Sequence, residues 1–187
     1  FQLEQAPTLI TDAEDFSAAT WTKVSGVTVS TNQSASPEGT TTADKLIAAN
    51  TSRSFQALSA NVNVSSGSSN VFSIYAKADE RNKISLREGS LTGAFASFDL
   101  TNGTVITDSS ANASIEDDGN GWFRCSIQVT VNNTFGARII PLPDNYTGGS
   151  VTGAFSDDGT SGVLIWGAQL EEGASATPYP PEPTKYL

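Results

Sequence analysis

Hydrophobic and polar residues alternate with a period of two along several stretches of the chain. The stretch 71–77 would place Phe72, Ile74 and Ala76 on one face of a strand and Ser73, Tyr75 and Lys77 on the other. The stretch 122–131 repeats this pattern. No window of eleven or more residues places apolar side chains at helical spacing between capping residues. The pattern therefore predicts an all-β chain in which each strand has one apolar face and one aromatic and basic face.

Turn signals separate the predicted strands. Asn102-Gly103, a strong hairpin signal, lies between the strand-like stretches 94–100 and 104–107. The stretches 118–121 and 157–162 are rich in Gly, Asp and Asn and predict further turns. Short strands separated by turns are typical of an antiparallel β-sandwich, in which two packed sheets bury the apolar faces.

A chain of 187 residues is long enough to bury a core within one domain. We place this β-sandwich domain at residues 9–177. Residues 1–8 form an N-terminal extension in this interpretation. Residues 178–187 contain four prolines, which disfavour a central strand, so we expect an extended C-terminal tail or linker.

The charge of the chain limits its partners. Twenty acidic and ten basic residues give a net charge of −10, which opposes binding to nucleic acid. No apolar stretch approaches the length of a membrane-spanning helix, so we expect a soluble protein without membrane insertion. The single cysteine, Cys125, excludes an internal disulfide, and its alternating position predicts a buried structural thiol.

Seven sequence blocks occur in the order found in one family of adhesive modules. They are 9–16, 21–23, 40–46, 72–78, 98–103, 120–125 and the most informative, 159–173. Together they resemble a domain that recurs in bacteriophage tail and virion proteins and is similar to jelly-roll, galactose-binding-like carbohydrate-binding modules. The resemblance covers most of the chain, from Leu9 to Pro178. It implies a jelly-roll fold and lectin-like adhesion at a virion or other extracellular surface, or in a larger secreted protein.

The polar faces of the strands carry the residues expected to bind a glycan. Flat aromatic rings pack on the apolar side of a sugar ring, while planar polar groups bind its hydroxyls. Arginine also suits the carboxylate of a uronate or a sulfate, so an acidic polysaccharide is an open alternative. The predicted ligand-binding residues are Tyr75, Lys77, Arg87, Trp122, Arg124, Arg138 and, in a Gly-rich loop at the groove edge, Tyr146. The alternative is that these side chains only cover the sheet or form a contact between protomers.

The other two tryptophans are predicted to lie in the core. Trp166 alternates in phase with Leu164, Ala168 and Leu170. Trp21 lies in a loop-like stretch near the expected first strand, where it could close one end of the sandwich.

A structural calcium ion is a further expectation, because related jelly-roll modules hold one between their first and last strands. Closure of the sandwich could bring the acidic start of the domain to the end of its last strand. The predicted ligands are Asp12, Glu14, Asp15, Gln169 and Glu171. The alternative is a solvated acidic rim without a metal.

Catalysis has little support in the sequence. The chain has no histidine, which removes the commonest general base. A pair of carboxylates could still cleave a glycoside, and the available ones are Glu88, Asp99, Glu116, Asp117 and Asp118. We therefore expect a non-catalytic module that binds a polysaccharide or cell-surface glycan and acts through several copies in an oligomer or next to other virion modules. The alternatives are a structural tail or virion decoration subunit and, less favoured, a polysaccharide lyase or hydrolase.

Overall fold

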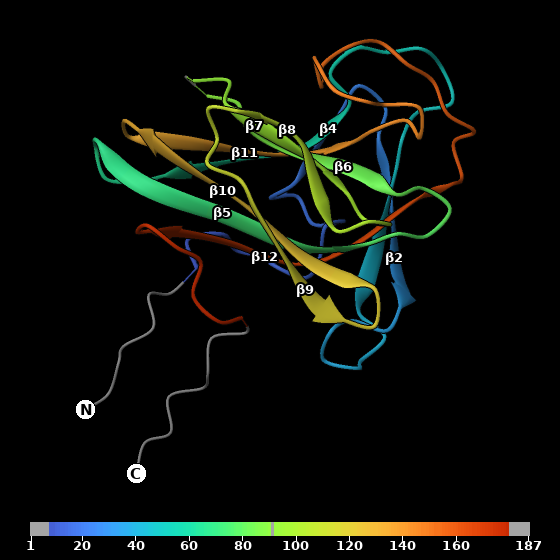
Figure 1. The fold of residues 1–187 in the computed structure, drawn as a ribbon, viewed down its shortest axis with the longest axis horizontal. Coiled ribbons are helices and arrows are strands. Elements are labelled where there is room, and N and C mark those ends of the chain that lie inside the picture. The colour runs from blue at the N-terminus through green and yellow to red at the C-terminus, as the bar shows by residue number, and fades with distance from the viewer. Residues whose placement is uncertain (1–7, 91, 180–187) are drawn as a thin grey trace.

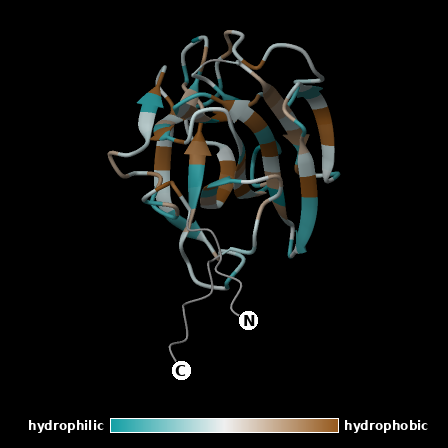
Figure 2. Cartoon of the chain, turned by 90° about the vertical axis from the view of Figure 1, so that its left-hand side faces the viewer, coloured by the Kyte–Doolittle hydropathy of each residue, from teal (hydrophilic) through white to brown (hydrophobic). Residues whose placement is uncertain are grey.

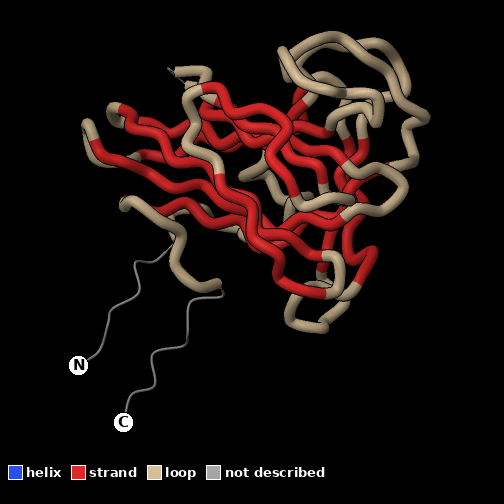
Figure 3. Tube along the Cα trace, viewed as in Figure 1, coloured by secondary structure: helices blue, strands red, loops and turns tan. Residues whose placement is uncertain are grey.

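The computed structural model describes residues 8–90 and 92–179 of the chain. Of the predicted N-terminal extension it therefore includes only Thr8, and of the predicted tail only Pro178 and Tyr179. The rest of both segments lies outside the described residues. Within the described part there is no helix, and so none that could cross a membrane (Figure 3).

Two six-stranded sheets pack face to face and confirm the predicted all-β sandwich (Figure 1). Every strand pair in both sheets is antiparallel. Sheet A contains, in spatial order, β1 (Thr22–Val24), β4 (Ala57–Asn63), β11 (Thr134–Pro141), β6 (Lys83–Glu88), β7 (Phe95–Asp99) and β8 (Thr104–Ser109). Sheet B contains β2 (Thr28–Ser34), β3 (Ala43–Ile47), β12 (Gly162–Glu172), β5 (Ser68–Lys77), β10 (Trp122–Val131) and β9 (Ser114–Gly119).

The chain passes repeatedly from one sheet to the other, as in a jelly roll. Across the core, β10 of sheet B contacts β6 and β7 of sheet A, and β9 contacts β8. The last strand, β12, lies between β3 and β5, so the C-terminal end of the domain is at the centre of its sheet. This closure joins segments that are far apart in the sequence and makes the sandwich one cooperative unit.

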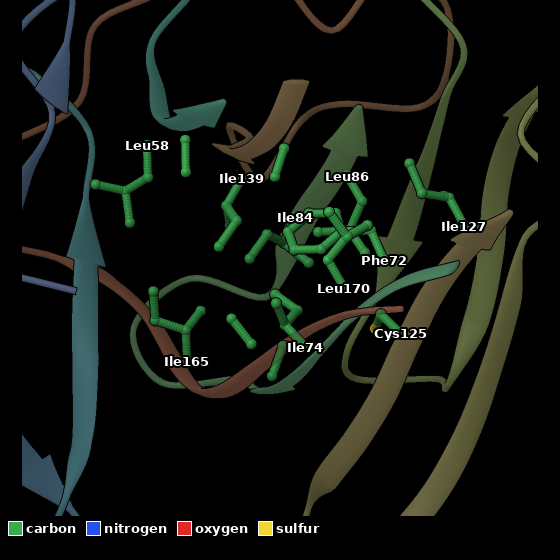
Figure 4. Packing of buried hydrophobic residues seen from close by; sticks show 14 of the residues in the cluster. Leu58, Phe72, Ile74, Ile84, Leu86, Cys125, Ile127, Ile139, Ile165 and Leu170 are labelled. Atoms are coloured by element: carbon green, nitrogen blue, oxygen red, sulfur yellow. The ribbon is translucent and has the colours of Figure 1, made fainter. Parts of the chain in front are cut away.

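The inner faces of both sheets form one hydrophobic core. Figure 4 shows side chains of both sheets meeting there, among them Leu58, Ile84 and Ile139 of sheet A and Phe72, Ile74 and Ile165 of sheet B. The predicted alternation along β5 and β10 is confirmed, since Phe72, Ile74, Ala76, Cys125 and Ile127 all point inward. The alternating bands of hydropathy are visible along the strands in Figure 2. The residues that the period-two pattern places on one face of each strand are therefore the residues that form the core.

Two isolated predictions about the core are also confirmed. Cys125 is fully buried, and burial raises the pKa of its thiol, as expected for an inert structural cysteine. Trp21 is buried against Phe16, with ring centroids 5.2 Å apart. Its indole nitrogen donates a hydrogen bond to the main-chain oxygen of Asp12 (3.2 Å). Trp21 therefore closes one end of the sandwich.

The hairpin between β7 and β8 turns at Asn102-Gly103, as predicted. Gly103 has φ +65°, which favours glycine. A Cβ atom at this position would lie 2.5 Å from Cε1 of Phe123 in β10. The turn therefore needs glycine both for its backbone conformation and for its packing against the second sheet.

Glu88, one of the carboxylates considered for catalysis, is fully buried at the end of β6. Its carboxylate accepts hydrogen bonds from the main-chain nitrogens of Ser90, Thr92 and Gly136 (2.7–3.0 Å) and from the hydroxyls of Ser90 and Thr92. Burial alone would raise the pKa of Glu88, but these hydrogen bonds outweigh it and lower the pKa from 4.5 to about 2. Glu88 thus organises the β6–β7 connection.

We predict that Glu88→Gln lowers the free energy of unfolding by about 2 kcal/mol at pH 6. The side-chain amide of Gln has an NH2 donor where the carboxylate has a charged oxygen acceptor, so some of the N–H and O–H groups around it lose their acceptor. The folded-state pKa of Glu88 lies below its unfolded value, so its contribution is complete above about pH 4.5 and is lost as the pH falls toward 2. Urea unfolding at pH 6 and pH 3 should show the difference between variant and wild type shrinking at the lower pH. Glu38→Gln, at an exposed turn, is the matched control and should have little effect. An equal loss at both pH values would contradict the assignment.

Candidate functional site

The seven predicted ligand-binding residues divide between opposite sides of the sandwich. Tyr75, Lys77, Trp122 and Arg124 come together on the outer face of sheet B, where β5 pairs with β10. The other three, Arg87, Arg138 and Tyr146, belong to sheet A and its loops. The prediction of a single groove lined by all seven is therefore wrong, because β6 and β11 belong to sheet A whereas β5 and β10 belong to sheet B.

Arg138 and Tyr146 both have structural partners on sheet A. The guanidinium of Arg138 donates hydrogen bonds to the main-chain oxygen of Ala60 (3.2 Å) and to the side chain of Asn61 (3.0 Å), and its side chain is buried. The hydroxyl of Tyr146 donates to the main-chain oxygen of Gly149 (2.7 Å), and its ring is buried in a cluster with Ile140 and Leu142.

Arg87 is only partly buried, and its guanidinium lies over the ring of Phe55 at 5.5 Å from the centroid. It contributes a cation–π contact on the outer face of sheet A. None of the three sheet A residues can therefore join Trp122 in one binding site.

The strand register arranges the outer face of sheet B in rows. One row contains Trp122, Lys77 and Leu164, and the next contains Arg124, Tyr75 and Trp166. We call Tyr75, Trp122 and Trp166 the aromatic cluster. Trp122 is 2% exposed and Tyr75 6% exposed, so these rings are covered, although the sequence predicted an open aromatic face.

A β-bulge at Gly167 places Trp166 in this cluster. The register between β12 and β5 slips between Trp166 and Gln169, and Gly167 has φ +63°. Ala168 and Leu170 beyond the bulge point into the core, whereas Trp166 and Leu164 before it point outward. Trp166 is buried, as predicted, but it does not share a face with Ala168 and Leu170.

Tyr75 and Trp166 of the aromatic cluster are covered by the chain's own C-terminal segment, residues 174–179, which we call the strap. The ring of Tyr179 packs edge-on against Trp166, with centroids 5.1 Å apart, and lies 6.3 Å from the ring of Tyr75. Its hydroxyl donates a hydrogen bond to Glu14 (2.8 Å). Pro178 and Tyr179 were expected to belong to an extended linker, but this part of the chain packs on the domain.

Thr177 attaches the strap to the last strand. Its main-chain nitrogen and its hydroxyl each donate a hydrogen bond to the carboxylate of Glu171 (2.7 Å). The amide nitrogen of Gln169 donates to the same hydroxyl (3.1 Å). Glu171 and Gln169 are both buried on the outer face of β12.

Arg124 connects the strap region with the rest of the sheet. Its guanidinium lies over the ring of Tyr75 at 5.4 Å and donates hydrogen bonds to Gln169 (2.6 Å) and Ser73 (3.2 Å). Its Nε atom is buried, and among the described residues it has no hydrogen-bond partner. A buried N–H group without an acceptor is costly, and a ligand oxygen would satisfy it.

Two polar hollows lie next to one another near β10, and Arg124 lines the smaller of them. The first, of about 150 Å³, is lined by Glu116, Arg124, Ser126 and residues 174–176 of the strap, among others. The second, of about 340 Å³, is lined mainly by Ser, Thr and Gly residues. Asn112 and Gln128 line both hollows, so the two are adjacent. We call the pair the polar groove.

Sequence reasoning missed most residues of the polar groove. Gln128 and Ser126 stand on the polar face of the predicted strand 122–131, so alternation alone could have identified them. Asn112 lies outside any strand, and residues 174–176 of the strap follow the last strand, β12. Only the tertiary structure brings these residues together.

The five predicted calcium ligands do not converge. The expected closure exists, since the nitrogen of Leu9 donates to the oxygen of Leu170 (2.7 Å). The side chains nevertheless have different partners: Asp12 accepts from Thr20, Asp15 from Ser17, Glu14 from Tyr179, Gln169 from Arg124 and Glu171 from Thr177. Within the described ranges no group of three or more His, Cys, Asp or Glu side chains is placed to hold a metal ion. These residues do not fit a calcium site, and calcium binding remains an untested expectation.

Glu14 and Asp15 instead line a hollow of about 410 Å³ next to Asp44. Asp44 is buried, and its two carboxylate oxygens accept hydrogen bonds from the main-chain nitrogens of Phe16 (3.0 Å) and Asn32 (2.9 Å). Burial raises the pKa of Asp44. Both oxygens are thus used to hold the loop before β1 against β2.

Of the carboxylates considered for catalysis, only Glu116 lines the polar groove, in register with Arg124. Asp99 and Asp117 accept main-chain hydrogen bonds within turns, from Thr101 and Gly119 respectively (both 2.8 Å). Asp118 lies on the edge strand β9, where burial raises the pKa of its carboxylate.

The chain is similar in fold to parts of two larger solved proteins. One is the enzymatically active domain of bacteriophage CBA120 tailspike protein 4, with 12% identity and a TM-score of 0.45 over 88% of this chain and 21% of that chain. The other is an arabinose-bound α-L-arabinofuranosidase, with 12% identity and a TM-score of 0.47 over 90% of this chain and 25% of that chain. This chain thus spans a quarter or less of either protein. No family model matches the chain, and no curated protein matches it significantly.

We predict that Gly167→Ala lowers the free energy of unfolding by about 1–2 kcal/mol, because alanine is strained at a left-handed φ. The added Cβ would also lie 2.9 Å from the ring of Tyr179 and 3.2 Å from that of Tyr75. Urea unfolding measures the effect. Gly153→Ala is the matched control, since a Cβ there meets nothing within 4 Å. Equal stability of the two variants would show that the bulge does not require glycine.

Proposed function

We propose that this protein is a non-catalytic carbohydrate-binding domain that holds a neutral, hydroxyl-rich polysaccharide in the polar groove of sheet B. The observation that carries the proposal is the guanidinium of Arg124. It is held by Tyr75, Gln169 and Ser73, and its buried Nε lacks an acceptor among the described residues. A sugar hydroxyl supplies such an acceptor.

The lining of the polar groove suits many weak hydrogen bonds. Ser, Thr, Asn and Gln side chains offer both donors and acceptors, which match the hydroxyl groups of a sugar better than an apolar ligand. Because Asn112 and Gln128 line both hollows, a ligand longer than one sugar ring could occupy the two together. A shallow site of this kind binds with modest affinity, because much of the contact energy offsets desolvation and ordering.

Fixed charge around Arg124 favours a neutral ligand over an acidic one. Glu116 lies opposite Arg124 in the register of β9 and β10 and lines the same hollow. Asp117 and Asp118 follow on β9, and the whole chain carries a net charge of −10. A uronate or sulfate would meet this negative field, whereas a hydroxyl would not. The acidic polysaccharide considered from the sequence is therefore the less favoured ligand.

The seven sequence blocks support a setting in a phage-like tail or virion protein, outside the cell. Weak sites become effective there when several copies are presented together in an oligomer or beside other modules. The competing proposal is a structural decoration subunit that uses the same face to contact another protein. Binding to isolated polysaccharide separates the two.

The test is affinity electrophoresis and isothermal titration calorimetry with dextran, galactomannan, arabinoxylan and alginate. We expect one of the three neutral polysaccharides to bind more tightly than alginate, and Arg124→Met to weaken binding at least tenfold. Arg87→Gln removes a guanidinium on the opposite side of the sandwich and should bind like wild type. If the folded protein binds none of the four polysaccharides and elutes from size-exclusion chromatography as a defined oligomer, the result would favour the structural decoration subunit. Soluble oligosaccharide products would instead indicate a hydrolase or lyase.

A further inference from the structure

We infer that the aromatic cluster is a second sugar subsite, for the apolar face of a pyranose ring, and that the strap fills it until a glycan chain displaces it. This inference rests on the proposed function, because the cluster adjoins the polar groove. It differs from the open aromatic face expected from the sequence, since Tyr75, Trp122 and Trp166 are all covered in this structure.

The strap makes the contacts that a bound sugar would make. The ring of Tyr179 packs against Trp166 (5.1 Å) and Tyr75 (6.3 Å), where a pyranose would place its C–H face. Two hydroxyls of the strap donate to carboxylates, that of Thr177 to Glu171 and that of Tyr179 to Glu14. A pyranose likewise presents an apolar C–H face together with hydroxyl groups that can donate hydrogen bonds to carboxylates.

The strap can leave without breaking the sheet. Residues 174–179 follow β12 and belong to no strand, so the β12 ladder with β3 and β5 does not depend on them. Thr177 is attached through the side chains of Glu171 and Gln169, Tyr179 through Glu14 and its ring contacts, and residues 172–175 are exposed. A segment held by a few side-chain contacts outside any ladder opens at a lower free-energy cost than a strand.

Departure of the strap would extend the polar groove into one longer site. Residues 174–176 form a wall of the smaller hollow, so their movement widens it. Gln169 and Glu171 would lose Thr177 and become available to sugar hydroxyls beside Arg124, which already binds Gln169. A glycan longer than the polar groove would therefore compete with the strap, and the closed state would weaken its apparent affinity.

The experiment opens the strap in two ways and measures both binding and exposure of tryptophan. Tyr179→Ala removes the ring, and Thr177→Val removes the hydroxyl hydrogen bonds while retaining the ring. Thr28→Val, at an exposed position of β2, is the matched control. Each variant is titrated with the polysaccharide that binds wild type best among dextran, galactomannan and arabinoxylan. Acrylamide quenching reports exposure, since Trp21, Trp122 and Trp166 are all at most 2% exposed in the closed domain.

We expect both strap variants to bind about tenfold more tightly than wild type, because the fraction of binding-competent protein rises. Their tryptophan emission should be quenched more strongly, and saturating polysaccharide should restore protection. Thr28→Val should match wild type in both measurements. Thr177→Val is nearly isosteric, so it tests the strap even if Tyr179→Ala destabilises the domain.

Two negative outcomes have different meanings. If wild type binds and the strap variants bind with unchanged or weaker affinity, the aromatic cluster is a covered structural patch and the inference is wrong. If neither wild type nor any folded variant binds the three polysaccharides, the proposed function itself fails. In that case the quenching data still show whether the strap opens, but the aromatic cluster is not a sugar subsite.

Discussion

The bulge at Gly167 interrupts the central strand of sheet B between two inward-facing pairs, Val163 and Ile165 before it and Ala168 and Leu170 after it. One extra residue at this point keeps both pairs in the core, although a regular strand would turn one of them outward. The bulge also divides the outer face of β12 into two parts. Trp166 lies before the bulge, among aromatic rings, whereas Gln169 and Glu171 lie after it, among hydrogen-bonding groups.

This division organises the outer face of sheet B into an aromatic half and a polar half, with Arg124 between them. Arg124 stacks over Tyr75 on one side and binds Gln169 on the other. Because its guanidinium is planar and fixed by these contacts, the orientation of its remaining donors is also fixed. Preorganisation of this kind reduces the cost of ordering the site when a ligand binds.

An exposed aromatic cluster would be a liability, since large apolar patches promote association. The strap reduces that risk by covering Tyr75 and Trp166 with Tyr179. The polar groove, by contrast, needs no cover because its lining is already compatible with water. The strap contacts both halves, through Tyr179 in the aromatic half and through Thr177 in the polar half.

The sequence by itself determined the all-β sandwich, the inward faces of β5 and β10, the Asn102-Gly103 hairpin and the burial of Trp21 and Cys125, because these depend on local alternation and turn chemistry. It also placed Tyr75, Lys77, Trp122 and Arg124 on one face, since residues of paired strands with matching periodicity must share it. Only the tertiary structure decided that Arg87, Arg138 and Tyr146 lie on the opposite sheet, that a bulge turns Trp166 outward and that the strap covers the aromatic cluster. Those features depend on which strands become neighbours and where one residue is inserted into a ladder, and neither is encoded in the local pattern of the chain.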